Sequence, residues 1–365
     1  MEKIKRFIDV NIPVTNCNLF CHYCYVSQIK ERDSLPIKFK YPVETIVKGL
    51  SKKRLGGVCH FNLCGMGETL IPKEVVEITR GLLAEGHYVI IVTNGTLTNR
   101  FKQFCEFPKD YRDRLGFKFS YHYLEQHRLN LTKTFFENVN MVWNAGISFT
   151  IELTPSDELE PQIDDVIKEV VENCGSKCHL TIPRDEINGT SLLLSKHSFD
   201  EWYKIWAVFE SPMLDFKKEL FYNRVRDYCY AGLWSGLLNL ETGIMRPCYY
   251  QRFEFGDIFK NLEKPIPFTP VGKCKAPYCH NGHAFLTLGL VPTMDTPKYS
   301  SMRDRTTNDN RSWYSKPMKD FLSQKLVDGN GLLSPSKKVQ YKFKRGMMKT
   351  KFYVTHGFRK VFKKK

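Results

Sequence analysis

The sequence of 365 residues lacks the features of membrane-spanning and secreted proteins. No run reaches the roughly 18 consecutive apolar residues that a transmembrane helix needs. The first ten residues, MEKIKRFIDV, lack the apolar core of a secretory signal. Twelve cysteines are too few for a disulfide scaffold at this length. These absences predict a cytosolic protein whose cysteines are metal ligands or buried thiols.

Internal repeats and Gly/Ser linkers are also missing, and 42% of the residues are hydrophobic. This composition predicts a globular protein of one or two domains. The net charge of +16 is unevenly distributed, because residues 337–365 hold twelve Lys and Arg and no Asp or Glu. Most of the basicity therefore belongs to this last segment, which weakens the case for nucleic acid as a partner of the whole protein.

Short apolar runs alternate with segments of helical period from Arg6 to about Arg184, a pattern typical of repeated βα units around a parallel sheet. Pro42 and Pro72 stand where helices are expected to begin. Strands are predicted at 7–14, 58–63, 88–93, 116–121, 147–153 and 179–183, and helices at 43–53, 72–85, 98–105, 132–144 and 161–173. We therefore expect an α/β fold with a partial (β/α)6 TIM-like barrel and its chemistry at the carboxyl ends of the strands.

The alternation ends after Glu186, where a helical stretch near 199–209 leads into a segment punctuated by Cys and Gly. We predict a barrel over residues 1–218, a small Cys-rich domain over 219–295, a polar connector over 296–336 and a basic aromatic tail over 337–365.

Three cysteines follow the first predicted strand, in the segment TNCNLFCHYCYV. Cys17, Cys21 and Cys24 have C-x3-C-x2-C spacing. Three thiolates on one short loop can hold three irons of a cubane cluster and leave the fourth iron without a protein ligand. A structural zinc site takes four ligands, and no fourth cysteine is near, although His22 lies inside the loop. The spacing favours a catalytic iron-sulfur cluster.

This loop, with Tyr23 before its last cysteine, resembles the C-x3-C-x-aromatic-C motif of the radical S-adenosylmethionine (radical SAM) superfamily. In that family the loop follows the first strand of a partial barrel, and the open iron of a [4Fe-4S] cluster binds SAM. Cleavage of SAM gives a 5′-deoxyadenosyl radical that abstracts hydrogen from a substrate. The resemblance implies a radical SAM enzyme that receives electrons from a donor such as flavodoxin or ferredoxin.

Residues after the second strand match another element of the family. Gly65, Gly67 and Glu68, in CGMGETL, resemble the Gly-Gly-Glu element that binds the amino group of SAM, with Met66 inserted between the glycines. The resemblance implies that these residues contact SAM.

The next two strands end in further candidates. Thr93 and Asn94 begin a Thr-Asn-Gly turn that resembles the one the family places near SAM. Ser120 ends the fourth strand, where the family often supplies a polar group to the SAM ribose. Asn-Gly is also a common turn, and the neighbouring His122 fits a rim histidine equally well.

Four more cysteines lie beyond the barrel, and Gly243 stands between the first two in a Cys-x13-Gly-x4-Cys pattern. This pattern resembles the SPASM and twitch extensions of some radical SAM enzymes, and four cysteines suffice for one auxiliary [4Fe-4S] cluster. There are two alternatives: His280 or His283 could replace one of the cysteine ligands, or the same residues could form a structural zinc site. The predicted ligands are Cys229, Cys248, Cys274 and Cys279.

The remaining cysteines have simpler interpretations. Four are expected to be buried or turn thiols: Cys59, Cys105, Cys174 and Cys178. Cys64 adjoins the glycine turn at the barrel mouth, where a thiol could donate a hydrogen atom to a substrate radical. Its alternative role is a small buried filler.

Fold and cofactor leave the substrate open. A carbohydrate or other small polar substrate, oxidised or epimerised, is the leading prediction, because twitch enzymes include ones that act on aminocyclitols. Peptide modification is the alternative, although only 16 residues precede Cys17, fewer than a leader-binding domain needs. Glu152, Arg184 and Asp185 are polar candidates at the barrel mouth. An electron carrier or RNA-binding protein is the non-enzyme alternative.

The tail alternates cations with aromatic and aliphatic residues, and Gly346 and Gly357 are expected to divide it into short segments. This mixture is suited to an anionic membrane interface, and it predicts a cytoplasmic enzyme that lies at the inner face of the membrane. Nucleic-acid binding and a solvated tail are the alternatives.

Overall fold

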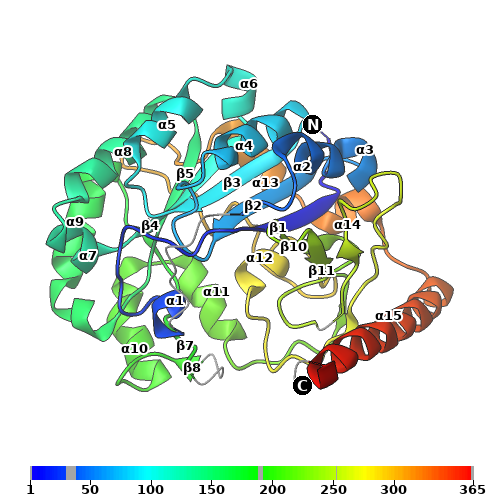
Figure 1. Cartoon of the computed structure of the whole chain (residues 1–365). Coiled ribbons are helices and arrows are strands. Elements are labelled where there is room, and N and C mark those ends of the chain that lie inside the picture. Colours follow the sequence, from blue (N-terminus) through cyan, green and yellow to red (C-terminus); the bar gives the residue numbers. More distant parts are fainter. Residues whose placement is uncertain (1, 30–37, 188–191, 252, 363–365) are drawn as a thin grey trace.

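The computed structural model describes residues 2–29, 38–187, 192–251 and 253–362, and their side chains as far as Thr355. A nine-stranded sheet crosses the centre of the molecule in the order β12-β11-β10-β1-β2-β3-β4-β5-β6 (Figure 1). The strands are β1 (Arg6–Ile12), β2 (Cys59–Gly65), β3 (Tyr88–Thr93), β4 (Leu115–Tyr121), β5 (Ser148–Leu153), β6 (His179–Leu180), β10 (Ser235–Asn239), β11 (Ile244–Arg246) and β12 (Gly256–Asp257).

Strands β1 to β6 are parallel neighbours in chain order, as expected for successive βα units. Most of their residues are buried, which fits a sheet covered on both faces. The predicted partial (β/α)6 barrel is confirmed, and the predicted strands agree with the observed ones to within three residues at each end.

Helices cover the outside of these strands, as Figure 1 shows for α4, α5, α8 and α9. The predicted helix at 43–53 is interrupted near Ser51 and forms α2 and α3. The helices of this half are α1 (Tyr25–Gln28), α2 (Val43–Gly49), α3 (Lys52–Leu55), α4 (Glu74–Ala84), α5 (Thr98–Cys105), α6 (Lys109–Arg112), α7 (Tyr123–Arg128), α8 (Thr132–Asn144) and α9 (Ile163–Cys174), with the 3-10 helix η1 (Asp157–Gln162).

The chain beyond the barrel extends the same sheet. Strand β10 pairs in parallel with β1, so that Phe7 lies opposite Ser235 and Asn11 opposite Asn239. Strands β11 and β12 continue in antiparallel fashion. The other elements here are β7 (Arg184–Asp185), β8 (Leu192–Leu193), α10 (Phe199–Trp206), η2 (Ala207–Phe209), α11 (Pro212–Leu220), β9 (Tyr228–Cys229), β13 (Gly272–Lys273) and α12 (Gly282–Phe285). The domain boundaries stay predictions.

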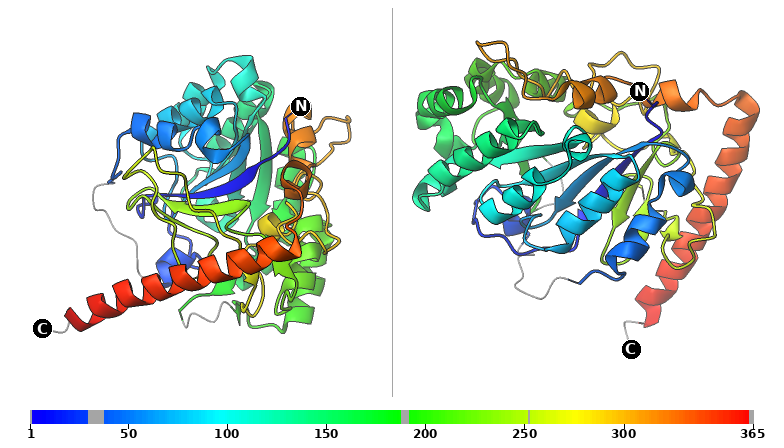
Figure 2. Two further views of the ribbon diagram at one scale, coloured as in Figure 1. Left: turned by 90° about the vertical axis from the view of Figure 1, so that its right-hand side faces the viewer. Right: turned by 90° about the horizontal axis from the view of Figure 1, so that it is seen from above.

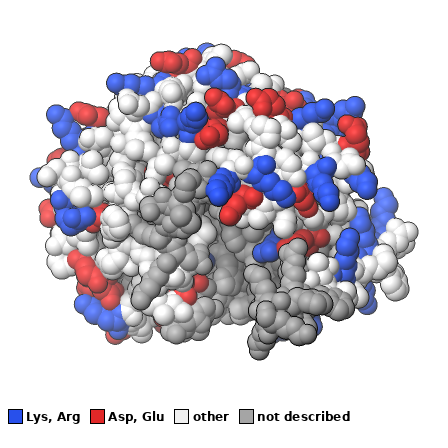
Figure 3. All heavy atoms as spheres, viewed as in Figure 1, with Lys and Arg blue, Asp and Glu red and all other residues white. Residues whose placement is uncertain are grey.

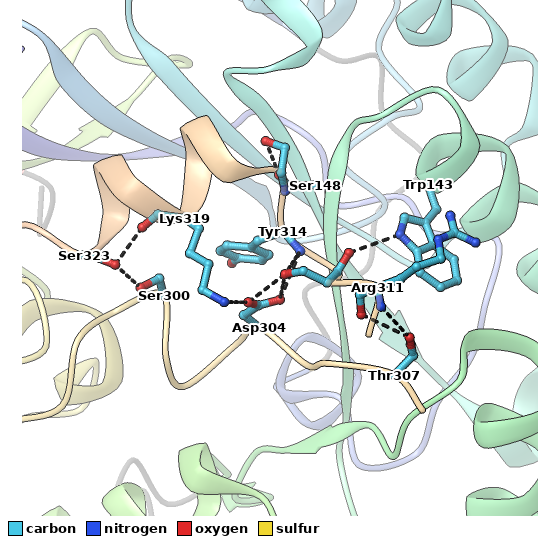
Figure 4. Close-up of polar contacts among 11 residues, drawn as sticks. Trp143, Ser148, Ser300, Asp304, Thr307, Arg311, Tyr314, Lys319 and Ser323 are labelled. Atoms are coloured by element: carbon cyan, nitrogen blue, oxygen red, sulfur yellow. Dashed lines mark hydrogen bonds and ion pairs between the residues drawn. The ribbon is translucent and has the colours of Figure 1, made fainter. Parts of the chain in front are cut away.

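The connector packs against the amino-terminal ends of the barrel strands. Asp304 accepts hydrogen bonds from Ser312 and the Tyr314 backbone N–H and pairs with Lys319 at 2.6 Å (Figure 4). The Trp313 ring stacks on Phe149 of β5 with centroids 5.0 Å apart. The Trp313 contact anchors the connector to the barrel, and the Asp304–Lys319 pair holds α13 (Lys316–Leu322) to the connector. Helix α14 (Leu326–Asn330) follows, and the Asn330 side chain donates to the Lys5 carbonyl at 2.9 Å.

The tail forms one continuous helix, α15 (Pro335–Phe362), so the expected division at Gly346 and Gly357 is wrong. A glycine inside a helix costs about 1 kcal/mol relative to alanine, which the surrounding helix-forming residues can offset. Figure 2 shows α15 along one side of the molecule, with its carboxyl end projecting beyond the rest. In the described part of the chain, no helix is long and apolar enough to cross a membrane.

Candidate active site

A cavity of about 720 Å³ opens at the carboxyl ends of the barrel strands. It brings together residues from every part of the barrel and from the segment that follows it. Cys279 of the second cysteine group also reaches this cavity. Its lining includes all the predicted residues of the barrel site: Cys17, Cys21, Cys24, Cys64, Gly65, Gly67, Glu68, Thr93, Asn94 and Ser120.

The glycine turn is fastened to the backbone that leads into the cysteine loop. The Gly67 N–H donates to the Val14 carbonyl at 2.8 Å, and the Glu68 N–H donates to the Asn16 carbonyl at 2.9 Å. A Cβ atom at Gly67 would lie 1.9 Å from the Asn16 carbonyl oxygen. Only glycine allows this close approach, so Gly67 fixes the start of the loop that carries Cys17.

The Thr-Asn-Gly turn holds the cysteine loop from the other side. The Asn94 Nδ2 donates to Oδ1 of Asn18 at 2.8 Å and lies 3.7 Å from the sulfur of Cys17. The Asn18 Nδ2 in turn donates to the Thr96 hydroxyl at 2.8 Å. These bonds place an amide donor beside Cys17 and orient the loop toward the cavity.

Glu68 connects the glycine turn to the Thr-Asn-Gly turn by hydrogen bonds. Its carboxylate accepts hydrogen bonds from the Thr93 hydroxyl and the Asn94 N–H, both at 2.7 Å, and from the Leu70 N–H at 2.9 Å. Burial raises the pKa of Glu68, and these three donors oppose the shift. Glu68 therefore organises both turns through bonds within the chain, in addition to lining the cavity.

The rim of the cavity carries a second polar contact to the cysteine loop. The Tyr23 hydroxyl and Nδ1 of His122 share a hydrogen bond at 2.7 Å. His22 turns outward and pairs with Glu158 at 2.9 Å, and both side chains are more than half exposed. His22 is therefore absent from the cavity lining, which leaves three cysteines of this loop as its metal-binding candidates.

The four later cysteines line one small cavity of about 50 Å³ with apolar neighbours such as Val271 and Phe285. Burial raises the pKa of the Cys248 thiol to about 11 and that of Cys279 to about 12. The negative charge of neighbouring cysteines adds to both shifts. The structure thus gathers residues that lie up to 50 positions apart in the chain, from Cys229 to Cys279.

Both cysteine groups suit iron-sulfur clusters by their donor chemistry, because cysteine thiolates are the usual ligands of these clusters. No group of three or more His, Cys, Asp or Glu in the described ranges is packed tightly enough to hold a single metal ion.

Among the mouth candidates, Glu152 and Arg184 line the cavity, whereas Asp185 does not. Asp185 accepts a hydrogen bond from the Ile187 N–H within its own turn. Cys64 also reaches the cavity, and burial raises the pKa of its thiol to about 12. Among the cysteines expected to be plain thiols, three are buried and Cys105 is partly buried. The buried ones are Cys59, Cys174 and Cys178.

The floor of the cavity holds charged residues that the sequence analysis did not identify. Asp9 accepts hydrogen bonds from Asn62 at 2.8 Å and from the Tyr249 hydroxyl at 2.7 Å. Lys118 of β4 and Lys217 of α11 line the same space. A signal for Lys118 exists in the strand GFKFSY, because alternation places it on the same face as Ser120 and opposite Phe117 and Phe119.

Glu152 lies at the centre of these charges. Its Oε1 pairs with Nε of the fully buried Arg303 at 3.5 Å. Burial acts to raise the pKa of Glu152, but Lys118, Arg303 and Lys217 outweigh it and the pKa lies below its usual value. Burial lowers the pKa of Lys217 to about 7 despite the opposing influence of Glu152. The floor is thus a charged, solvent-poor pocket in which a lysine can change its protonation near neutral pH.

Comparison with known proteins agrees with this geometry. A family model described as the radical SAM superfamily matches residues 11–153, which include the cysteine loop and both turns. No curated protein matches this chain.

Solved structures show the same fold. Streptococcus suis SuiB matches with a TM-score of 0.50 and 14% identity over 72% of this chain and 67% of SuiB. Native anSMEcpe with bound AdoMet and Cp18Cys peptide matches with a TM-score of 0.51 and 16% identity over 78% and 84% of the two chains. Residues 11–153 therefore form a radical SAM domain, and members of this superfamily use a [4Fe-4S] cluster and SAM.

Proposed function

We propose that Cys17, Cys21 and Cys24 hold the [4Fe-4S] cluster that binds SAM and that the enzyme acts on a carbohydrate or another small polar substrate. The observation that carries this proposal is the shared cavity, which joins the three thiols to the Glu68 network above and to a charged floor below. When bound, the cluster and SAM supply the 5′-deoxyadenosyl radical that removes a hydrogen atom from the substrate.

The chain's own residues position the reactants. Gly65 and Gly67 let the turn approach the cysteine loop, and Glu68, fixed by Thr93 and Asn94, presents a carboxylate that can accept from the amino group of SAM. Ser120 lines the cavity beside them and can bind the ribose hydroxyls. Cys64 lines the same cavity, and its proposed role is to donate a hydrogen atom to the substrate radical if the reaction is an epimerisation.

We further propose that Cys229, Cys248, Cys274 and Cys279 hold an auxiliary [4Fe-4S] cluster in a twitch-like segment. The four thiols share one small cavity, and Cys279 lines both this cavity and the larger one. A cluster there would lie beside the substrate space and could accept an electron from it. Structural zinc is the competing occupant, and metal analysis of anaerobically prepared protein separates the two.

The charged floor favours a small polar molecule over an apolar one, because Asp9, Lys118, Glu152 and Lys217 all face the space available to a substrate. Oxidation and epimerisation are both compatible with this arrangement. A peptide or protein substrate is the alternative, as bound in the matched anSMEcpe structure. Flavodoxin or ferredoxin is the proposed electron donor.

Deuterium transfer tests the substrate class. Reduced, reconstituted protein is incubated with SAM and a panel of deuterated sugars and aminocyclitols or deuterated peptides, and the 5′-deoxyadenosine is analysed by mass spectrometry. We expect 5′-deoxyadenosine to gain one deuterium atom from a member of the sugar and aminocyclitol panel. Deuterium transfer from the peptides alone would show that the substrate is a peptide and not a carbohydrate or other small polar molecule.

We also propose that the protein is cytoplasmic and that α15 lies on an anionic membrane surface. Exposed apolar residues recur along one face of this helix at Val339, Phe343, Met347 and Val354. The opposite face is attached to the body, since Met348 and Phe352 pack against the core. Figure 3 shows Lys and Arg along the edge that α15 forms. An outward apolar face among cations suits a lipid interface.

Vesicle sedimentation tests this placement. We expect the full chain to sediment with anionic vesicles at about 0.1 M salt, where surface charges act over about 10 Å. Phe343→Ser with Met347→Ser should abolish most of the binding, while Lys109→Met, at a distant exposed lysine, should leave it unchanged. Equal sedimentation of a chain that ends at Ser336 would refute the proposal, and tighter binding to RNA than to vesicles would favour nucleic acid.

A further inference from the structure

Lys118 is a buried lysine of β4. Its side chain is only 9% exposed and lines the large cavity. No hydrogen bond or ion pair of Lys118 occurs within the described ranges of the chain. Lys118 stands two residues before Ser120 on the same strand, so it lies one step deeper in the barrel than the carboxyl ends where the cysteine loop and both turns meet.

Lys217 approaches the same space from α11. Its ammonium donates to the Thr181 hydroxyl, and both residues line the cavity. Lys118, Glu152 and Lys217 line the same cavity, and both lysines act electrostatically on Glu152. His283 also lines the cavity, and both lysines act to lower its pKa.

The charges at this point do not balance. Glu152 is paired with Arg303 and interacts electrostatically with both lysines. Asp9 adds a second carboxylate, whose oxygens accept hydrogen bonds from the neutral side chains of Asn62, Tyr249 and Asn281. Three basic side chains thus share two carboxylates. An excess of buried positive charge is costly unless a proton leaves or an anion binds.

We propose that Lys118 and Lys217 bind an anionic group of the substrate, a carboxylate or a phosphate, at the floor of the cavity. This inference rests on the proposed function and narrows its substrate class to a small polar molecule that carries a negative charge. Burial lowers the pKa of Lys217, and a bound anion would raise it. The uncharged part of the substrate would then extend upward to Cys64 and the SAM-side turns.

Anion binding can be measured on the reconstituted full chain in the presence of SAM, with inorganic phosphate and acetate as separate probes and ligand-observed NMR as the readout. We expect Lys118→Met and Lys217→Met each to weaken binding of the preferred probe at least tenfold, and Lys118→Arg to retain most of it. Lys109→Met, at an exposed lysine 79% accessible to solvent, is the matched control and should bind like the wild type. The stronger probe identifies the group as phosphate or carboxylate.

Unchanged anion affinity in the Lys118→Met, Lys217→Met double variant would overturn the inference, as would the absence of binding to the wild type. An equal loss of SAM affinity in these variants would assign the lysines to the carboxylate of SAM and would also overturn it. SAM cleavage is followed in the same samples. Wild-type protein that binds the anion but never cleaves SAM would refute the proposed function and leave the anion site standing.

Discussion

The two cysteine groups differ in how the chain supplies them and in what surrounds them. Cys17, Cys21 and Cys24 come from a single loop and line a polar cavity of about 720 Å³. The later group is assembled from residues between Cys229 and Cys279 and lines a small cavity with apolar neighbours. The first arrangement leaves room for a ligand beside its cysteines, whereas the second ties distant parts of the chain together.

This contrast indicates that the two cysteine groups have different functions. Three ligands beside a large cavity suit a cluster that must bind a further molecule, and four ligands in a confined cavity suit a cluster that is closed. The surroundings agree, because Asn94 and Glu68 organise the first site by hydrogen bonds, while Val271 and Phe285 pack around the second. The first site should therefore control chemistry, and the second should also control stability.

The largest effect is expected when the first group is removed. Replacing Cys17, Cys21 and Cys24 together by Ala should abolish SAM cleavage and lower the iron content from about eight to about four per chain, because the second group is supplied by other residues. Iron and sulfide analysis measures this. Loss of all iron would show that the two sites depend on each other and would break the comparison.

Removal of the second group should act on stability as well as on iron. Cys229→Ala with Cys248→Ala should remove about four irons per chain and lower the melting temperature, because bound metal closes a long loop only in the folded state. Calorimetry of the anaerobic protein checks this, with Cys105→Ala as a control at a partly buried cysteine outside both cavities. Zinc in place of iron would contradict the auxiliary cluster and leave the first site intact.

A smaller change tests the fit between the glycine turn and the cysteine loop. Gly67→Ala places a Cβ atom 1.9 Å from the Asn16 carbonyl oxygen, so the loop must shift. We expect at least a tenfold loss of SAM affinity in equilibrium binding, about 1.4 kcal/mol, with the barrel still folded. Gly346→Ala, where the added atom meets nothing within 4 Å, is the control and should change only helix stability, by up to about 1 kcal/mol. Equal SAM affinity in both variants would show that the glycine turn does not contribute to SAM binding.

The smallest effect concerns the charged floor, which only the first site possesses. Lys217 has a pKa lowered to about 7 by burial, so its neutral amine should form as the pH rises through 7. Acylation by a limiting reagent, followed by peptide mass spectrometry from pH 5 to 11, measures the midpoint of Lys217, with a short lysine-containing peptide as the reference. Bound phosphate or acetate should raise the midpoint of Lys217. A midpoint of Lys217 equal to that of the reference peptide would contradict a desolvated lysine.

Much of the barrel could be predicted because its signals are local. Alternating apolar runs located β1 to β6, and the spacing of Cys17, Cys21 and Cys24 located the loop that follows β1. The residues predicted around SAM line the cavity because the carboxyl ends of parallel strands meet at one edge of a sheet.

Long-range contacts were harder to foresee. Strand β10 pairs beside β1 although more than 200 residues separate them, and no local pattern specifies that partner. Arg303 reaches Glu152 from a segment that looked like a polar connector. Lys217 lies on a helix with neighbouring charges, so only the folded chain shows that it faces the cavity. Such residues acquire their environment from tertiary packing and not from their own segment.

The most direct test of this account is the formation of 5′-deoxyadenosine by reduced, reconstituted protein with SAM. We predict product from the wild type and from the Cys229→Ala, Cys248→Ala variant, and none from the variant in which Cys17, Cys21 and Cys24 are Ala. Product from that triple variant, or none from wild-type protein that carries its full iron and binds SAM, would contradict the assignment of the first cysteine loop as the site of SAM chemistry.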